Sequence, residues 1–297
     1  MELMTKTVDE LKGKPYVSWY SGQETYLETT GEVPMLRFRA DREADWLGLA
    51  FSTRLGGVSS GHLSSMNLGW DRGEPRENVC ENYKRICRAM GVNDQKLVLS
   101  DQVHDKKVCY VDESFAAGEE MTKKLQGIDG LVTDIPGLVL ATSYADCVPL
   151  FFYDTRCRLI ASSHSGWKGT VLKIGEATLE TMQERGSRLE DIHVVIGPSI
   201  CQECYEVSED VAKQFHTAYG EECCRDILKK GRNIQGEQKY QLDLWAANWH
   251  QLVKAGISPS HVHISGVCTC CNHELLYSHR YTNGKRGNLN GFLYIKP

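Results

Sequence analysis

The sequence predicts an α+β fold, a single domain in which mixed β-sheets are sandwiched with flanking helices. Short β-rich runs follow one another too closely for repeated βαβ units, which favours antiparallel or mixed sheets. Amphipathic helical patterns lie among these runs, and no proline-rich linker divides the chain. Of the 297 residues, 41% are apolar and 25% are charged, a globular composition that excludes disorder as the main state.

The first half of the sequence indicates strands around one long helix. Residues 35–38 and 46–53 have strand character and are separated by a polar segment. Residues 75–90 carry apolar side chains at spacings of three and four, and Gly91 stands where such a helix would end. Five further strands are predicted at residues 96–99, 107–111, 138–143, 150–153 and 159–163.

The second half mixes helices and strands in the same way. A helix is predicted to begin at Ser208, because Glu209 and Asp210 place negative charge in its positive first turn. An apolar stripe containing Trp245 and Trp249 predicts another helix with one buried face, which is core rather than a cofactor site. This helix with the tryptophans is predicted at 242–254. The remaining elements are predicted as a helix at 171–184 and strands at 192–196, 261–267 and 292–295.

Charge and hydropathy exclude several classes of protein. The 34 basic residues are scattered among 39 acidic ones, which predicts no nucleic-acid partner. Residues 1–14 lack the apolar core of a secretory signal, and the longest uncharged apolar stretch, residues 135–145, is far shorter than the ~20 residues that cross a bilayer. We therefore expect a cytoplasmic protein with no membrane partner, whose twelve cysteines are reduced thiols.

Three side chains in strand-rich segments are candidates for chemistry. Cys147 and His164 are separated by two short predicted strands, which places them at the ends of neighbouring β segments, and His104 lies between two other strands. One thiolate and two imidazoles are suitable ligands for zinc, and three protein ligands leave a fourth position open, as in catalytic sites. The spacing alone is not diagnostic, since a single histidine between strands is usually a surface or core residue.

Several ordered motifs resemble the laccase-domain proteins, a family also called multicopper polyphenol oxidase, purine nucleoside phosphorylase and peptidoglycan editing factor. The resemblance runs from about Phe51 to the C-terminus. The motifs are FSTRLGGVSSGHLSSMNLG at 51–69, Gln102 with His104, Asp129, Ala145-Asp146-Cys147, the segment 164–169, Gly197-Pro198, Cys204-Tyr205-Glu206-Val207 and Cys268-Thr269.

This resemblance implies a laccase-domain fold with zinc held by His104, Cys147 and His164. It implies phosphorolysis of adenosine, inosine, guanosine or methylthioadenosine, and deamination of adenosine, with a purine nucleoside and phosphate as partners. Arg54 matches the family's arginine before a Gly-Gly turn, and a guanidinium suits phosphate, so we expect Arg54 to contact phosphate and to be catalytic with the three ligands. We further predict a laccase-domain-like catalytic domain at residues 46–297, with residues 1–45 as a β-rich extension packed on it.

The sequence departs from the family pattern at two places. His279 precedes Arg280 where an Arg-Arg pair is expected, and Lys168 stands where many relatives have arginine. Lys168 keeps the positive charge of that arginine, but a lysine cannot make the bidentate contacts of a guanidinium. The common zinc-deaminase signature, H-x-E with P-C-x-x-C, is absent, so deamination would need a different arrangement.

Other functions remain open at this stage. Cys147 could be the nucleophile of a hydrolase, with His164 or His104 as base. Copper is a possible alternative to zinc, and the protein would then be a polyphenol oxidase. Such an enzyme needs imidazoles to hold several copper ions, and the ten histidines are dispersed along the sequence. A non-enzymatic binding module is a further alternative, and the oligomeric state is not indicated.

Two cysteine-rich motifs could form a second, structural zinc site. Cys201 and Cys204 make one C-x-x-C pair, and Cys268 and Cys271 make another. The segment between the pairs is far longer than the ~15–20 residues of a compact zinc module, which argues against a shared site.

Overall fold

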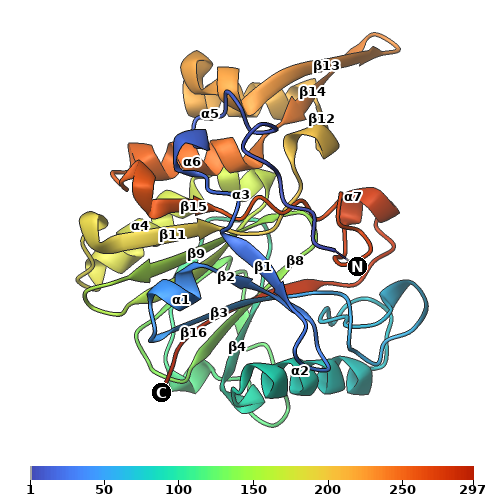
Figure 1. Cartoon of the computed structure of the whole chain (residues 1–297), viewed down its shortest axis with the longest axis vertical. Helices are drawn as coiled ribbons and strands as arrows, with labels where there is room; N and C mark the ends of the chain where they lie inside the picture. The colour runs from blue at the N-terminus through green and yellow to red at the C-terminus, as the bar shows by residue number, and fades with distance from the viewer. Residues whose placement is uncertain (1) are drawn as a thin grey trace.

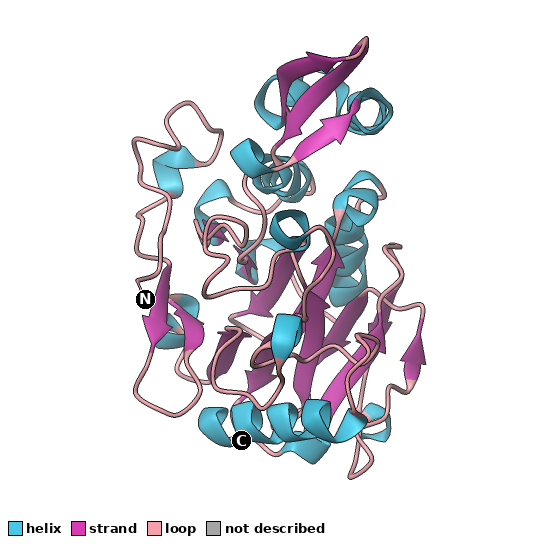
Figure 2. Cartoon of the chain, turned by 90° about the vertical axis from the view of Figure 1, so that its right-hand side faces the viewer, coloured by secondary structure: helices cyan, strands magenta, loops and turns pink. Residues whose placement is uncertain are grey.

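The computed structural model describes residues 2–297 and consists of four layers. Helix α2 covers one face of a seven-stranded sheet, a six-stranded sheet packs on the other face, and further helices cover its outer side (Figures 1 and 2). Both large sheets contain parallel and antiparallel pairs. The predicted α+β class with mixed sheets is confirmed.

The seven-stranded sheet has the order β1-β2-β3-β16-β8-β4-β6. Its neighbours are antiparallel except at β4, which runs parallel to both β8 and β6. The strands are β1 (Thr25–Glu28), β2 (Met35–Phe38), β3 (Leu47–Ser52), β4 (Leu97–Asp101), β6 (Leu125–Gln126), β8 (Val139–Tyr144) and β16 (Leu289–Ile295).

The six-stranded sheet has the order β15-β11-β9-β10-β7-β5. Its centre is antiparallel, whereas β15 with β11 and β5 with β7 form parallel pairs at the two edges. The strands are β5 (Val108–Tyr110), β7 (Gly130–Thr133), β9 (Val148–Asp154), β10 (Ile160–Ser165), β11 (Ile192–Ile196) and β15 (Val262–Ile264).

A third, three-stranded sheet was not predicted from the sequence. It consists of β12 (Glu206–Ser208), β13 (Leu228–Ile234) and β14 (Glu237–Leu242), and it projects at the top of Figure 1 beside α5. Most side chains of β13 are exposed, so the strand lacks the apolar alternation that reveals a half-buried strand.

The four predicted helices are present, and three short helices, Ala40–Glu43, Trp167–Val171 and His279–Thr282, were not predicted. The predicted helix at 171–184 begins only at Ile174, after a break at Lys173, which adopts a left-handed backbone, and the helix after Ser208 is kinked at Gly220. Gly91 ends α2 in the left-handed conformation, as predicted. The helices are α1 (Ala40–Glu43), α2 (Arg76–Met90), α3 (Trp167–Val171), α4 (Ile174–Glu184), α5 (Glu209–Ile227), α6 (Leu244–Lys254) and α7 (His279–Thr282).

Successive side chains along each strand point to opposite faces of the sheet and so pack against different layers. On β9, Phe151 is buried between the two sheets, whereas Phe152 is buried against the outer helices with Trp245 of α6. The apolar face of α2, including Tyr83, packs on the far side of the seven-stranded sheet. Because β9 and β10 are covered on both faces, all their residues are buried, which fixes the strand ends rigidly.

The first 45 residues contribute strands to the main sheet. β2 pairs with β3, and β1 forms the sheet edge beyond β2. The domain boundary placed after residue 45 stays a prediction.

Among residues 2–297, no helix combines the length and apolarity needed to span a bilayer.

Candidate metal centre

The three predicted ligands lie at one end of the two stacked sheets. His104 follows β4, and Cys147 lies in the connection from β8 of one sheet to β9 of the other. His164 lies near the end of β10, where it pairs with Pro149 of β9. Since β4 and β8 are parallel and β10 is antiparallel to β9, these strand ends meet at the same edge, and the sequence prediction of neighbouring β segments is correct.

The donor atoms of the three residues lie within 4.8 Å of one another. Cys147 Sγ is 3.8 Å from His104 Nε2, and the two imidazole rings meet edge to face with centroids 4.7 Å apart. Zn–S and Zn–N bonds of about 2.3 and 2.0–2.1 Å place tetrahedral S and N ligands roughly 3.6 Å apart. The separations and the chemistry of the donors therefore fit one zinc ion.

Asp129 holds two of these ligands in place. Its buried carboxylate accepts hydrogen bonds of 3.0 Å from the backbone N–H groups of Val103, His104 and Asp105, and it lies 2.9 Å from His164 Nδ1. His104 has a φ of 64°, a left-handed conformation that lets successive N–H groups converge on an anion. With Nδ1 occupied, Nε2 of His164 is the nitrogen left to face the cluster.

The thiol of Cys147 and the imidazole of His164 each stabilise the charged form of the other. Burial raises the pKa of Cys147, but the imidazoles of His164 and His104 outweigh it and lower the pKa to about 6. Burial lowers the pKa of His164, but the Cys147 thiolate and the Asp129 carboxylate raise it to about 9. Without metal, the site therefore favours a thiolate beside an imidazolium.

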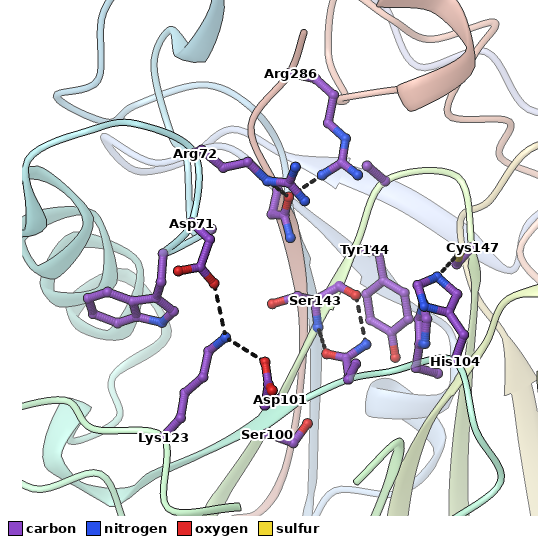
Figure 3. Close-up of a pocket in the computed structure, with 16 residues that line it drawn as sticks. Asp71, Arg72, Ser100, Asp101, His104, Lys123, Ser143, Tyr144, Cys147 and Arg286 are labelled. Carbon is purple, nitrogen blue, oxygen red and sulfur yellow. Dashed lines mark hydrogen bonds and ion pairs between the residues drawn. The ribbon is translucent and has the colours of Figure 1, made fainter. Parts of the chain in front are cut away.

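The cluster opens onto two adjoining cavities. One of about 170 Å³ includes Tyr144, Arg72 and Arg286 in its wall, with the two arginines at the top of the view and His104 and Cys147 at its right (Figure 3). The other, of about 340 Å³, includes Trp167, Tyr205, Ile200 and Leu244. His104, Cys147 and Arg286 border both cavities, so two of the three candidate ligands lie where the two spaces meet, and His164 borders the smaller one.

Arg72 and Arg286 were missed in the sequence analysis. Arg72 Nε donates to Asn288 Oδ1 at 2.9 Å, and Arg286 donates to the same oxygen. In residues 2–297, neither has a carboxylate within ion-pair distance, and Arg286 Nε is buried without a partner. Burial and the charge of Arg72 lower the pKa of Arg286 to about 10. The pair thus carries positive charge without a direct carboxylate partner. Its sequence signal was only that each arginine precedes a glycine.

Arg54 is not brought to these cavities. Its guanidinium donates to the carbonyl oxygen of Ser64 at 2.9 and 3.0 Å and to that of His273 at 3.1 Å, and it lies over the Tyr277 ring. These contacts hold two loops together. The phosphate contact expected of Arg54 stays a prediction.

Gln102 also has a positioning role in the structure. Its side-chain amide donates to Ser143 O at 2.9 Å and accepts from Ser143 N at 2.7 Å, continuing the β4–β8 pairing beyond the strand. This bidentate contact fixes the start of the His104 loop.

The fold and the site define a four-layer α+β protein with a His-Cys-His donor cluster at the ends of its strands. Residues 48–296 match the family model described as "Multi-copper polyphenol oxidoreductase laccase". The chain belongs to this family, and the predicted resemblance is confirmed.

Relatives of known name cover most of the chain. It is 36% identical over 250 residues to "Purine nucleoside phosphorylase YlmD" of Bacillus subtilis (strain 168), covering 83% of this chain and 87% of the relative. It is 35% identical over 234 residues to "Adenosine deaminase RL5" of an unknown prokaryotic organism, covering 78% and 87%. The crystal structure of YlmD from Geobacillus stearothermophilus superposes with a TM-score of 0.84 at 30% identity, covering 93% of this chain and all of that one.

Proposed function

We propose that this chain is a zinc-dependent purine nucleoside phosphorylase that also deaminates adenosine. The observation that carries the proposal is the cluster of His104, Cys147 and His164 beside two adjoining cavities, one of which presents a pair of arginines that have no direct carboxylate partner. The names of the relatives support purine nucleosides as the substrate class. A cytoplasmic location stays a prediction from the sequence.

In phosphorolysis, a phosphate oxygen forms a bond to ribose C1′ while the bond from C1′ to the purine nitrogen breaks and its electron pair leaves with the base. We assign phosphate binding to Arg72 and Arg286, because two guanidiniums without carboxylate partners suit a dianion. The second cavity, with the aromatic rings of Trp167 and Tyr205, suits a purine. These residues therefore bring the two reactants together beside the cluster.

In deamination, a water oxygen adds to purine C6 and ammonia leaves. When bound by His104, Cys147 and His164, zinc supplies Lewis-acid catalysis. Asp129 keeps both histidines in their ligating orientation, and the left-handed backbone of Asp146 directs Cys147 toward them.

The test is to incubate zinc-loaded protein with adenosine, with and without phosphate, and to separate the products by chromatography. The proposal expects adenine and ribose 1-phosphate with phosphate, and inosine and ammonia without it. Inosine, guanosine and methylthioadenosine are each expected to release their base only when phosphate is present. Absence of both reactions in protein with a full zinc site would refute the proposal.

A cysteine-nucleophile hydrolase is the second candidate, favoured by the lowered pKa of Cys147. Alkylation separates the two: a metal-free protein that is active and loses activity with iodoacetamide supports the nucleophile. Zinc that protects Cys147 from alkylation while supporting activity supports the phosphorylase.

Copper-dependent phenol oxidation is suggested only by the description of the family. Within residues 2–297, only one cluster of potential metal ligands contains histidine, and a multicopper oxidase needs imidazoles for several ions. Copper-loaded protein that oxidises a phenol with oxygen, and has no nucleoside activity, would favour this alternative.

A further inference from the structure

We propose that Cys201, Cys204, Cys268 and Cys271 bind a second zinc ion, a structural one, next to the candidate active site. The four sulfur atoms lie within 4.8 Å of one another, and Cys204 Sγ is 3.6 Å from Cys271 Sγ. In a tetrahedral site with Zn–S bonds of about 2.3 Å, sulfur atoms are roughly 3.8 Å apart. The cluster therefore has nearly the dimensions of a tetrathiolate zinc site.

The fold explains how motifs so distant in sequence meet. Cys201 and Cys204 follow β11, and Cys268 and Cys271 follow β15, which is the parallel neighbour of β11. Parallel neighbours end at the same edge of a sheet, and the pairing continues past the strands through a bridge between Ser199 and Cys268. The long segment between the two C-x-x-C pairs argued against a shared site in the sequence. The pairing of β11 with β15 brings the two pairs together whatever the length of that segment.

Local geometry prepares Cys268 as a ligand. Its sulfur accepts the backbone N–H of Cys201 at 3.3 Å and that of Cys271 at 3.4 Å. Such N–H donors stabilise a thiolate, which is the form that binds metal. Each C-x-x-C pair lies on a tight turn, so both of its sulfur atoms project to the same side, and the two turns face each other.

The N-terminal segment covers the cluster. Lys6 N donates to Gly266 O at 2.8 Å, Thr5 bridges to Val267, and Asn272 exchanges two hydrogen bonds with the backbone of Met4. Cys201 and Cys268 are each only 2% exposed, whereas Cys204 and Cys271 are partly exposed. Four converging thiols in a partly buried site repel one another when ionised, and a divalent cation compensates that charge.

The second site is coupled to the first through Asp146. The Asp146 carboxylate accepts a 2.6 Å hydrogen bond from the hydroxyl of Thr269, next to Cys268. The Asp146 carbonyl accepts from the N–H of Ile200, next to Cys201. Asp146 has a φ of 85° and precedes Cys147, so the structural zinc would fix the backbone that presents a ligand of the other site.

The test is zinc content per chain, measured by mass spectrometry on full-length protein purified from zinc-supplemented cells under reducing conditions. The wild type is expected to carry two zinc ions. The double variant Cys204→Ser/Cys271→Ser is expected to carry one at most, and His104→Ala/His164→Ala is expected to retain one. Cys270→Ser is the matched control from the same segment and keeps two.

X-ray absorption at the zinc edge tests the site without altering any of the four cysteines. Two filled sites predict an average of about 2.5 sulfur ligands per zinc in the wild type, and His104→Ala/His164→Ala raises this to about four. A single zinc with about one sulfur ligand, a disulfide between Cys204 and Cys271 in freshly purified protein, or iron in place of zinc would each overturn the proposal. The expected total of two rests on the proposed zinc at His104, Cys147 and His164, but the number of sulfur ligands per zinc distinguishes failure of that site from failure of this one.

Discussion

The carboxylate of Asp129 lies 2.9 Å from Nδ1 of His164 and also accepts the backbone N–H of His104. One buried anion thereby positions two ligands that come from different sheets. The hydrogen bond and charge of His164, together with the backbone donors, outweigh burial and lower the pKa of Asp129. The carboxylate therefore stays ionised at neutral pH and retains its donors.

Replacing Asp129 with asparagine should weaken zinc binding without removing a ligand. The amide oxygen cannot serve all four donors, and loss of such a partner typically lowers metal affinity by about 10–100-fold. Competition with a chromophoric chelator measures the change, and Asp134→Asn, at an exposed aspartate, is the control. Unchanged zinc affinity would show that Asp129 does not position the ligands.

Gly166→Ala should disrupt the cluster while leaving the fold intact. A Cβ at Gly166 would lie 2.8 Å from His104 Cδ2 and 3.0 Å from Cys147 Sγ, so both ligands must move. We expect loss of zinc from this site with an unchanged far-ultraviolet circular dichroism spectrum. Gly31→Ala, where a Cβ meets no atom within 4 Å, is the matched control. Full zinc affinity in Gly166→Ala would contradict the proposed geometry.

Arg286→Ala should raise the KM for phosphate by about tenfold or more, because a charge-assisted contact to a dianion is lost. The KM for the nucleoside should change less, and exposed Lys285→Ala should behave as the wild type. Arg54→Ala provides a contrast. Its contacts to Ser64 O and His273 O predict a lower melting temperature with little effect on the phosphate KM. A raised phosphate KM in Arg54→Ala alone would favour the role expected from the sequence.

His193 should make the fold sensitive to acid. Burial and the neighbouring His261 and His263 lower its pKa from 6.5 to about 4, and its ring stacks 3.9 Å from that of His261. Between these values the unfolded chain binds a proton that the folded chain does not, so the free energy of unfolding falls as the pH drops from 6.5 towards 4.

The expected contribution of His193 to this fall in the free energy of unfolding is about 1–2 kcal/mol, after discounting for the partial exposure of its side chain. Denaturant unfolding of wild type and His193→Phe at several pH values measures it. The variant should lose less stability across this range. Parallel curves for the two proteins would show that His193 does not contribute.

Local sequence patterns predicted most elements of this fold, because the buried faces are regular. Helix α2 follows from its apolar spacing and Gly91, and the strand ends that carry Cys147 and His164 follow from short apolar runs. The third sheet was missed because β13 is mostly exposed, and the break before α4 was missed because its left-handed residue is Lys173 rather than a glycine.

Features of the site that depend on long-range pairing could not be predicted in the same way. Asp129 was noted as a polar residue, but its contact with His164 depends on the pairing of β7 with β10. Arg72 and Arg286 lie on loops far apart in sequence and meet only at Asn288. The two C-x-x-C pairs were judged by their separation along the chain, whereas their distance in space is set by β11 and β15.

The central claim is that zinc at His104, Cys147 and His164 supports phosphorolysis. Its most direct test is to remove metal with a chelator and to follow base release from inosine and phosphate as zinc is restored, in wild type and in Cys147→Ala. Wild-type activity is expected to rise with zinc until this site is filled, with no recovery in Cys147→Ala. Full activity of the metal-free wild type, or equal recovery in the variant, would contradict it.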